Sequence, residues 1–159
     1  MATAASLIPE LEDAICNGSA ERRAEMLRRI TALFVDGASY YNEDLVGVFD
    51  DVLVRLIAEI ESKTLVELAH RLSPLDNAPI QLMRRLAWND DIAVAAPVLK
   101  RSARLDEMDL VSIASEKGPD HLLAISLRSH IGEAVTDVLV NRGNQDVARS
   151  VANNQGASS

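Results

Sequence analysis

Cysteine and aromatic residues are scarce in this sequence, and each scarcity excludes a class of protein. Cys16 is the single cysteine among 159 residues, which rules out an intrachain disulfide framework and a cysteine-based metal site. Aromatic residues make up only 3% of the chain, whereas hydrophobic residues of all kinds make up 48%. The core must therefore be aliphatic, and an aliphatic core suits packed helices better than a β-sandwich.

Long apolar runs and basic stretches are also missing. No apolar run approaches the roughly 20 residues that cross a bilayer, and the N-terminus carries acids where a signal peptide needs basic residues. Residues 1–61 carry 5 basic and 12 acidic side chains, and residues 62–159 carry 11 and 12. Binding to a nucleic-acid backbone requires a basic stripe. The composition therefore predicts a cytoplasmic protein that binds neither membranes nor nucleic acid.

What the sequence has throughout is helical periodicity. Apolar residues recur every three or four positions between turn signals such as Asn17-Gly18 and Asp36-Gly37. Ser19 stands where the N-cap of one such segment is expected. The pattern predicts helices over residues 7–15, 20–36, 43–60, 65–72, 80–87, 92–99, 105–114, 121–128, 131–140 and 147–151.

The clearest of these expected helices follows Asn42, its predicted N-cap. Its apolar positions obey the i, i+3, i+4, i+7 rule and form one predicted core face, made of Leu45, Val48, Phe49, Val52, Leu53, Leu56, Ile57 and Ile60. Asp50, Asp51, Glu59 and Glu61 are expected on the opposite, solvent-exposed face.

Internal similarity indicates a degenerate repeat. "LVELA" at residues 65–69 recurs as "LVSIA" at residues 110–114, and "NDDIA" at residues 89–93 recurs as "NQDVA" at residues 144–148. Spacings of roughly 40 to 47 residues are typical of HEAT-type helical pairs, in which a proline-bent helix such as that around Pro97 is familiar.

The resulting prediction is an all-α fold in two parts that form one structural unit. Residues 1–61 are expected to form an acidic, three-helix N-terminal segment. Residues 62–159 are expected to form stacked antiparallel helical hairpins, a HEAT-like α-α superhelix.

Four strings carry a resemblance to a known family: "SLIPELEDAI" at 6–15, "FDDVLVRLIAEIE" at 49–61, "NDDIAVAAPVL" at 89–99 and "HLLAISLRSHIGEAVTDVLVNRG" at 121–143. They resemble an uncharacterised bacterial family, domain of unknown function 2336, with HEAT-like helical repeats. Members of that family typically continue well past this point, so we expect a fragment or a short member. The resemblance implies a helical-repeat fold and brings no catalytic residues.

Few side chains suggest chemistry. Glu67 and His70 form one Glu-x-x-His pair, but di-iron bundles need two such pairs and two further glutamates, so a surface contact is favoured. His121 and His130 lie near the starts of expected helices, where capping or turn roles are favoured over general base catalysis. Cys16 is expected to be buried as a small hydrophobe.

Paired cations are the other candidates for a site. Such pairs usually belong to a solvated, ion-paired helix face. If the hairpins stack, however, five cations could converge on one edge and form a surface for an anion or a partner: Arg84, Arg85, Lys100, Arg101 and Arg104.

The favoured function is a non-catalytic scaffold for protein–protein interaction, with no metal and no cofactor. Known phosphate-loop, nucleophile-elbow and zinc-site motifs are absent from the sequence. The partner is not identified, and a homodimer is expected because Val147 and Val151 would lie uncovered at the end of a truncated stack. Two alternatives stay open: a regulatory module that binds a small anionic ligand or phosphorylated partner, and a metalloenzyme.

Overall fold

The structure is a computed structural model that describes residues 13–15 and 17–154. Its elements are helices packed against one another, which confirms the predicted all-α fold. Residues 13–15 and 17 are helical, and the earlier part of the first expected helix lies outside the described residues. The other elements are α2 (Ala20–Gly37), the 3-10 helix η1 (Ala38–Tyr40), α3 (Glu43–Leu56), α4 (Ser62–Leu72), α5 (Ile80–Ala87), α6 (Ile92–Arg101), α7 (Glu107–Glu116), α8 (Pro119–Ser126), α9 (Glu133–Arg142) and α10 (Gln145–Asn153).

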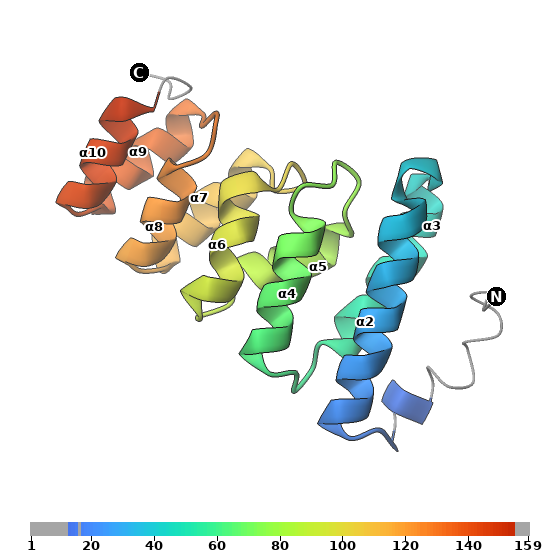
Figure 1. Cartoon of the computed structure of the whole chain (residues 1–159). Coiled ribbons are helices and arrows are strands. Elements are labelled where there is room, and N and C mark those ends of the chain that lie inside the picture. The colour runs from blue at the N-terminus through green and yellow to red at the C-terminus, as the bar shows by residue number, and fades with distance from the viewer. Residues whose placement is uncertain (1–12, 16, 155–159) are drawn as a thin grey trace.

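The helices lie in two rows (Figure 1). The front row, nearer the viewer, contains α2, α4, α6, α8 and α10, and the rear row contains α3, α5, α7 and α9. Along the front row each helix contacts the next, and in the rear row α3 contacts α5 and α7 contacts α9. Neighbours in the chain such as α4 and α5, α7 and α8, or α9 and α10 also contact one another. Helix pairs are therefore stacked in series, and α2 and α3 continue the same two rows.

Polar side chains begin several helices as the sequence predicts. The Ser19 hydroxyl accepts from the Arg22 N–H at 3.2 Å and starts α2. The Asn42 side chain accepts from the Leu45 N–H at 2.9 Å and starts α3. Each of these oxygens satisfies an N–H group that has no partner within its own helix.

The core is aliphatic along the whole stack. Fully buried leucines, isoleucines and valines, such as Leu53, Leu99 and Val135, come from helices of both rows. Three aromatic rings, those of Phe34, Tyr41 and Phe49, gather near the N-terminal end, where the Phe34 ring centroid lies 5.1 Å from that of Phe49 in an edge-to-face contact.

The buried face of α3 differs from the predicted one. Leu45 and Val48, expected in the core, are 40% and 58% exposed, whereas Val46 is only 2% exposed. Asp50, expected in solvent, is 6% exposed. Phe49, Leu53 and Leu56 are buried as predicted, so the periodic pattern was correct as to the helix and most of its core face. It was wrong at the edge of that face, where a polar contact brings Asp50 inward.

That contact joins Asp50 to the start of α5. Its carboxylate accepts hydrogen bonds from the N–H groups of Gln81 at 2.8 Å and Leu82 at 2.9 Å. The N-cap of α5 is Pro79, which offers no side-chain hydrogen bond. Asp50 therefore caps α5 from a different helix, and its negative charge suits the positive end of the α5 dipole.

The end of α3 also differs from the expected one. The helix ends at Leu56, and Glu59 adopts a left-handed backbone conformation with φ of 63°. Ile60 is 8% exposed, so it joins the core from the connection to α4 rather than from a helix.

Side-chain hydrogen bonds tie the loops that follow successive front-row helices. After α8, the Arg128 guanidinium donates to the carbonyls of Leu99 at 2.6 Å and Ser102 at 2.7 Å. After α6, Arg104 Nε donates to the carbonyl of Ala78 at 2.7 Å. Each arginine therefore satisfies carbonyl groups at the end of the preceding repeat.

Asn154 makes the same kind of contact after α10, because its amide donates to the carbonyls of Ser126 at 2.8 Å and Arg128 at 2.6 Å. One hydrogen bond from each of these side chains reaches a carbonyl 26 residues earlier in the chain, as seen for Arg104, Arg128 and Asn154. A two-helix unit is thus shorter than the roughly 40 to 47 residues of HEAT-type pairs. The similar strings "LVELA" and "LVSIA" lie in α4 and α7, which belong to different rows.

Candidate functional site

The five cations expected on one edge occupy three places in the structure. Arg84 and Arg85 lie in the last turn of α5, Lys100 and Arg101 lie in the last turn of α6, and Arg104 lies in the following loop. A helix C-terminus carries partial negative charge, so a cation there stabilises the helix by about 0.3–1 kcal/mol. This placement gives the paired cations a role in helix stability whether or not they bind a ligand.

Two of these cations are held by carboxylates. Arg84 Nε lies 3.1 Å from an oxygen of Asp109, which also closes the capping box of α7 with Asp106. Arg104 Nη2 lies 2.7 Å from an oxygen of Glu43. The Arg84 pair joins α5 to α7 in the rear row, so both arginines already serve the packing of the stack.

Arg84 and Arg85 line a groove of about 500 Å³ beside α3 and α5. Ile57 and Leu65 contribute apolar walls, and Trp88 contributes a half-buried aromatic one. The groove thus combines apolar walls with one ion-paired arginine and one exposed arginine.

Lys100 and Arg101 line a different groove, of about 340 Å³, between α4 and α6. We call it the α4–α6 groove, and its other lining residues are Val66, His70, Ala93, Ala96 and Pro97. Val66 and His70 stand one turn apart on α4 and face the small side chains of α6. Because alanine is short, the backbone of a bound segment can approach this part of α6 closely.

One end of the α4–α6 groove is positively charged. His70 and Arg71 occupy the last turn of α4, and Lys100 and Arg101 occupy the last turn of α6. His70 lines the groove with Lys100 and Arg101, whereas Arg71 lines a pocket between α4 and α2. All four side chains are exposed, and within residues 13–15 and 17–154 none of them forms an ion pair. Asp91 caps the opposite end of α6, so charge along the groove changes from acidic to basic.

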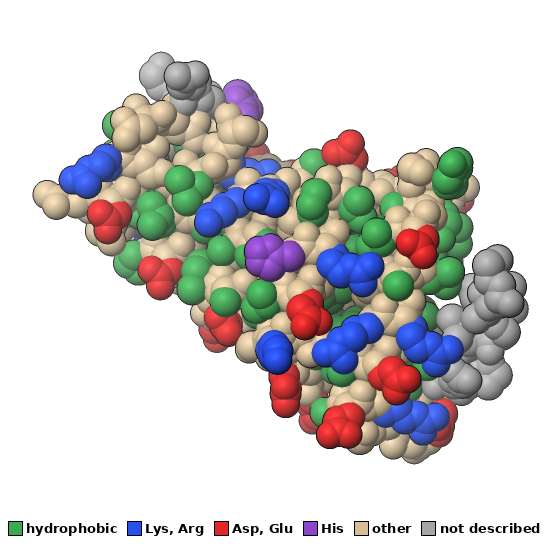
Figure 2. Space-filling model, in the orientation of Figure 1, with side chains coloured by type: hydrophobic (Ala, Val, Ile, Leu, Met, Phe, Trp, Pro, Cys, Tyr) green, Lys and Arg blue, Asp and Glu red, His purple; other side chains and the backbone are tan. Residues whose placement is uncertain are grey.

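The floor of the α4–α6 groove contains Pro97, inside α6. Proline has no N–H, so it cannot donate to the carbonyl of Ala93, one turn earlier. Figure 2 shows Lys and Arg side chains next to hydrophobic ones on the face of the front row. The groove therefore offers apolar contact, a hydrogen-bond acceptor and cations within a short distance.

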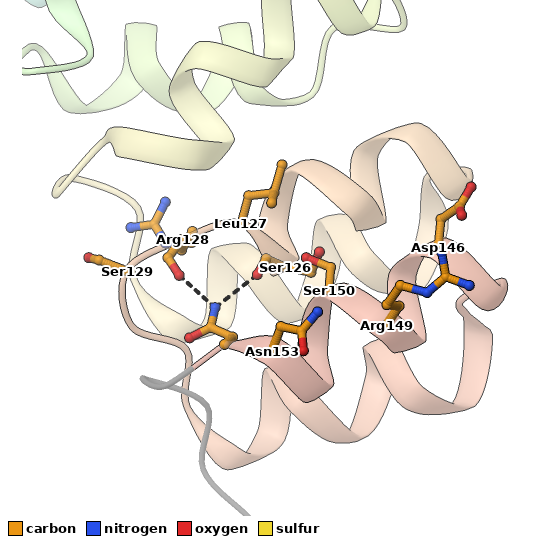
Figure 3. Close-up of a pocket in the computed structure, with 9 residues that line it drawn as sticks. Ser126, Leu127, Arg128, Ser129, Asp146, Arg149, Ser150 and Asn153 are labelled. Atoms are coloured by element: carbon orange, nitrogen blue, oxygen red, sulfur yellow. Dashed lines mark hydrogen bonds between the residues drawn. The ribbon is translucent and has the colours of Figure 1, made fainter.

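A third groove, of about 490 Å³, lies between α8 and α10 (Figure 3). Most of the residues that line it are of polar types, with Arg149, Ser150 and Asn153 from α10 and Ser126 and Ser129 from the end of α8 and its following loop. The hydrogen bonds of Asn154 to the loop after α8 lie beside it.

The apolar end that led us to expect a homodimer is covered. Val147 is 0% exposed and Val151 is 8% exposed, because α10 packs on both α8 and α9. The premise that these two valines are uncovered was therefore wrong.

The other candidate side chains take structural positions. Glu67 pairs with Arg28 of α2 at 3.5 Å, and within the described residues no group of three or more potential ligands could hold a metal ion. His121 is buried, and its Nε2 lies 2.8 Å from the carbonyl oxygen of Asn89. His130 is exposed, and the side chain of Cys16 lies outside the described residues.

Among the residues that the structure describes, two ionisable groups have shifted pKa values, and neither lines the α4–α6 groove. The Lys117 ammonium donates to the Asp90 carboxylate and holds the pKa of that carboxyl below its usual value. The same ammonium lies 5.8 Å from the centre of the Trp88 ring. Burial lowers the pKa of the Arg128 guanidinium, although an arginine stays charged under ordinary conditions.

Comparison with known proteins identifies the C-terminal part of the chain. Residues 94–158 match the model of DUF2336, an uncharacterised protein family conserved in bacteria. The predicted resemblance is confirmed for this region, which extends from within α6 to beyond α10. No curated protein and no solved structure matches the chain. The DUF2336 match includes the α6 cations Lys100 and Arg101 but not the α4 side of the groove.

Among the described residues, no helix has both the length and the apolar character that crossing a membrane requires.

Proposed function

We propose that this chain is a non-catalytic helical-repeat module, HEAT-like in organisation, that binds a segment of a protein partner in the cytoplasm. The observation that supports it is the α4–α6 groove, which joins an apolar floor to a cluster of cations without ion pairs. In a helical stack, stability comes from contacts between neighbouring helices. The outer side chains are therefore free to serve recognition.

The bound segment is an acidic amphipathic helix. A groove between two helices is the shape that accepts a third helix, which places apolar anchors at positions i, i+3, i+4 and i+7. Val66, Ala93 and Ala96 offer small apolar contacts for such anchors. Lys100 and Arg101 offer positive charge for acidic side chains of the partner, which speeds association and excludes basic partners.

The test uses a fluorescein-labelled acidic amphipathic peptide of about 15 residues, long enough for about four helical turns. Fluorescence anisotropy measures its binding to the wild-type chain and to Lys100→Glu/Arg101→Glu. Because two attractive charges become repulsive, we expect binding to weaken at least about tenfold in the variant, which corresponds to about 1.4 kcal/mol. Higher salt should weaken binding to the wild-type chain as well.

A matched control is Arg85→Glu/Arg149→Glu, which changes the net charge equally at two exposed sites away from this groove. It should retain wild-type binding of the peptide. Equal loss in both variants would show that only overall charge matters, and absence of binding to the wild-type chain would refute the proposal.

The second candidate is a regulatory module for a small anionic ligand, favoured by Lys100 and Arg101 at the end of the groove. Inorganic phosphate is the simplest probe, and its effect on the melting temperature measures binding. Two results together would favour this candidate over a protein partner. Phosphate would raise the melting temperature of the wild-type chain but not of Lys100→Glu/Arg101→Glu, and the wild-type chain would not bind the acidic peptide.

A further inference from the structure

The outer face of α3 is a second surface with unexplained side chains. Leu45 and Val48 are 40% and 58% exposed, although both are large and apolar. Asp44 and Asp51 are also exposed. Asp44 precedes Val48 by four residues and Asp51 follows it by three, so both lie on the same side of the helix as Val48. This α3 stripe is therefore an acidic amphipathic helix surface that the described part of the chain leaves exposed.

The α3 stripe has the chemistry that the α4–α6 groove selects. Its valine and leucine match the apolar floor around Val66 and Ala96, and its two aspartates match the basic end at Lys100 and Arg101. Within one molecule the two surfaces belong to different rows, since α3 lies in the rear row and the groove in the front row. Only a second molecule can bring them together.

Charge also varies in a matching direction along the two surfaces. The α3 stripe begins with Asp44 and ends with Arg55, also exposed. Helix α6, which forms one wall of the groove, follows its N-cap Asp91 and ends with Lys100 and Arg101. With α3 antiparallel to α6, acidic side chains meet the cations and Arg55 approaches Asp91.

We propose that the α4–α6 groove binds the α3 stripe of a second copy of this chain, so that the protein self-associates head to tail. This inference rests on the proposed function, because it names the occupant of the same groove. Two copies joined in this way leave one groove and one α3 stripe free between them, so the contact is heterologous. Such contacts build rings or open chains of subunits rather than closed two-fold dimers.

Sedimentation velocity on the full chain, up to about 0.5 mM, measures the self-association; that range detects a contact of about 4–5 kcal/mol. We expect a concentration-dependent rise in sedimentation coefficient that about 0.5 M salt reduces, since the Debye length then falls below about 5 Å. Lys100→Glu/Arg101→Glu and Asp44→Lys/Asp51→Lys should each raise the dissociation constant of self-association at least about tenfold, because each reverses one of the two charged surfaces.

Mixing these two charge-reversed variants gives the sharpest result. The groove variant has an acidic groove and an acidic stripe, whereas the stripe variant has a basic groove and a basic stripe. In the mixture each groove can therefore bind a stripe of opposite charge, so the mixture should associate although neither variant does alone. The control Arg85→Glu/Arg149→Glu should associate like the wild-type chain. Leu45→Ser/Val48→Ser removes the apolar contact without a change of charge, and it should also weaken association.

A wild-type chain that stays monomeric throughout this range would overturn the inference. So would a mixture that fails to associate while both variants keep their wild-type helix content by circular dichroism. Neither result affects the proposed function, because binding of the acidic peptide is measured separately and depends on the groove alone.

Discussion

At the scale of single residues, Asp50 shows how one carboxylate can determine the orientation of a helix. It is 6% exposed and accepts two hydrogen bonds from the first N–H groups of α5. If α3 were turned so that Leu45 and Val48 entered the core, the carboxylate would move into solvent. The N–H groups of Gln81 and Leu82 would then lose their partner, and no side chain at Pro79 could replace it.

Replacing Asp50 with asparagine tests this role. The amide keeps one oxygen acceptor but loses the negative charge, and it brings an NH2 group toward two N–H donors. Because hydrogen bonds to charged groups contribute about 1.5–3 kcal/mol, we expect Asp50→Asn to lower the free energy of unfolding by about 2 kcal/mol. Urea denaturation followed by circular dichroism measures the loss.

Asp51→Asn provides the control, since Asp51 is exposed on the next position of the same helix. Its effect should stay within about 0.5 kcal/mol, as for most surface substitutions. Similar losses in both variants would mean that the buried contact to α5 adds little to stability.

Sequence reasoning at this scale succeeded where the contact is local and failed where it is not. Ser19 and Asn42 bond to N–H groups three residues away, so the sequence alone predicts them as caps. Asp50 bonds to residues 31 and 32 positions away, a separation that no local pattern reveals. For α3 the periodic pattern therefore predicted the helix and most of its buried residues, but not the burial of Asp50 or the exposure of Leu45 and Val48.

At the scale of elements, the loops after the front-row helices depend on one arginine or asparagine each. Arg128 is half-buried and spans the carbonyls of Leu99 and Ser102. A guanidinium presents several N–H groups in one plane, so it can satisfy two carbonyls at once. This contact holds the end of α6 against the loop after α8.

Arg128→Lys should therefore destabilise the chain although it keeps the charge. A lysine ammonium is a point donor on a flexible stem and cannot reproduce the planar pair of hydrogen bonds, so we expect a loss of about 1–2 kcal/mol. Thermal unfolding measures this loss. Arg149→Lys, at an exposed position on α10, should leave the melting temperature unchanged, and an equal shift in both variants would contradict the assigned role of Arg128.

The candidate site was predictable only in part, because the sequence does not show how the helices are arranged in rows. The sequence shows the cationic pairs Arg84-Arg85 and Lys100-Arg101, and their places at helix ends follow from the helix boundaries. It does not show that α5 lies in the rear row and α6 in the front row, which assigns the two pairs to different grooves. His70 joins Lys100 through contact between α4 and α6, so its place in the groove required the structure.

At the scale of the whole molecule, the stack is close to one-dimensional. Each front-row helix packs on the adjacent helices of that row and on nearby helices of the rear row, and α2 makes no substantial contact with α10. In such an arrangement stability is approximately a sum over repeats and the contacts between neighbours. A defect at one end should then loosen that end before it affects the other.

Two matched cavities at opposite ends test this behaviour. Val147 of α10 and Leu53 of α3 are both 0% exposed, and truncation of such side chains to alanine costs about 1–5 kcal/mol. Val147→Ala should raise the amide hydrogen exchange of α9 and α10, which pack directly on one another, and leave α2 and α3 near wild-type values. Leu53→Ala should do the reverse.

The pattern of hydrogen exchange depends on whether the chain unfolds as a whole or unfolds locally from its ends. If the chain unfolded only as one cooperative unit, each substitution would raise exchange by the same factor in every helix, because all amides would exchange through the same unfolded state. If the stack opens from its ends, the increase should fall with distance from the cavity. The α4–α6 groove lies between the two ends, so local opening in either variant should leave it intact. Binding of the acidic peptide should consequently survive both substitutions, whereas uniform exchange together with loss of peptide binding would contradict a stack built from neighbour contacts.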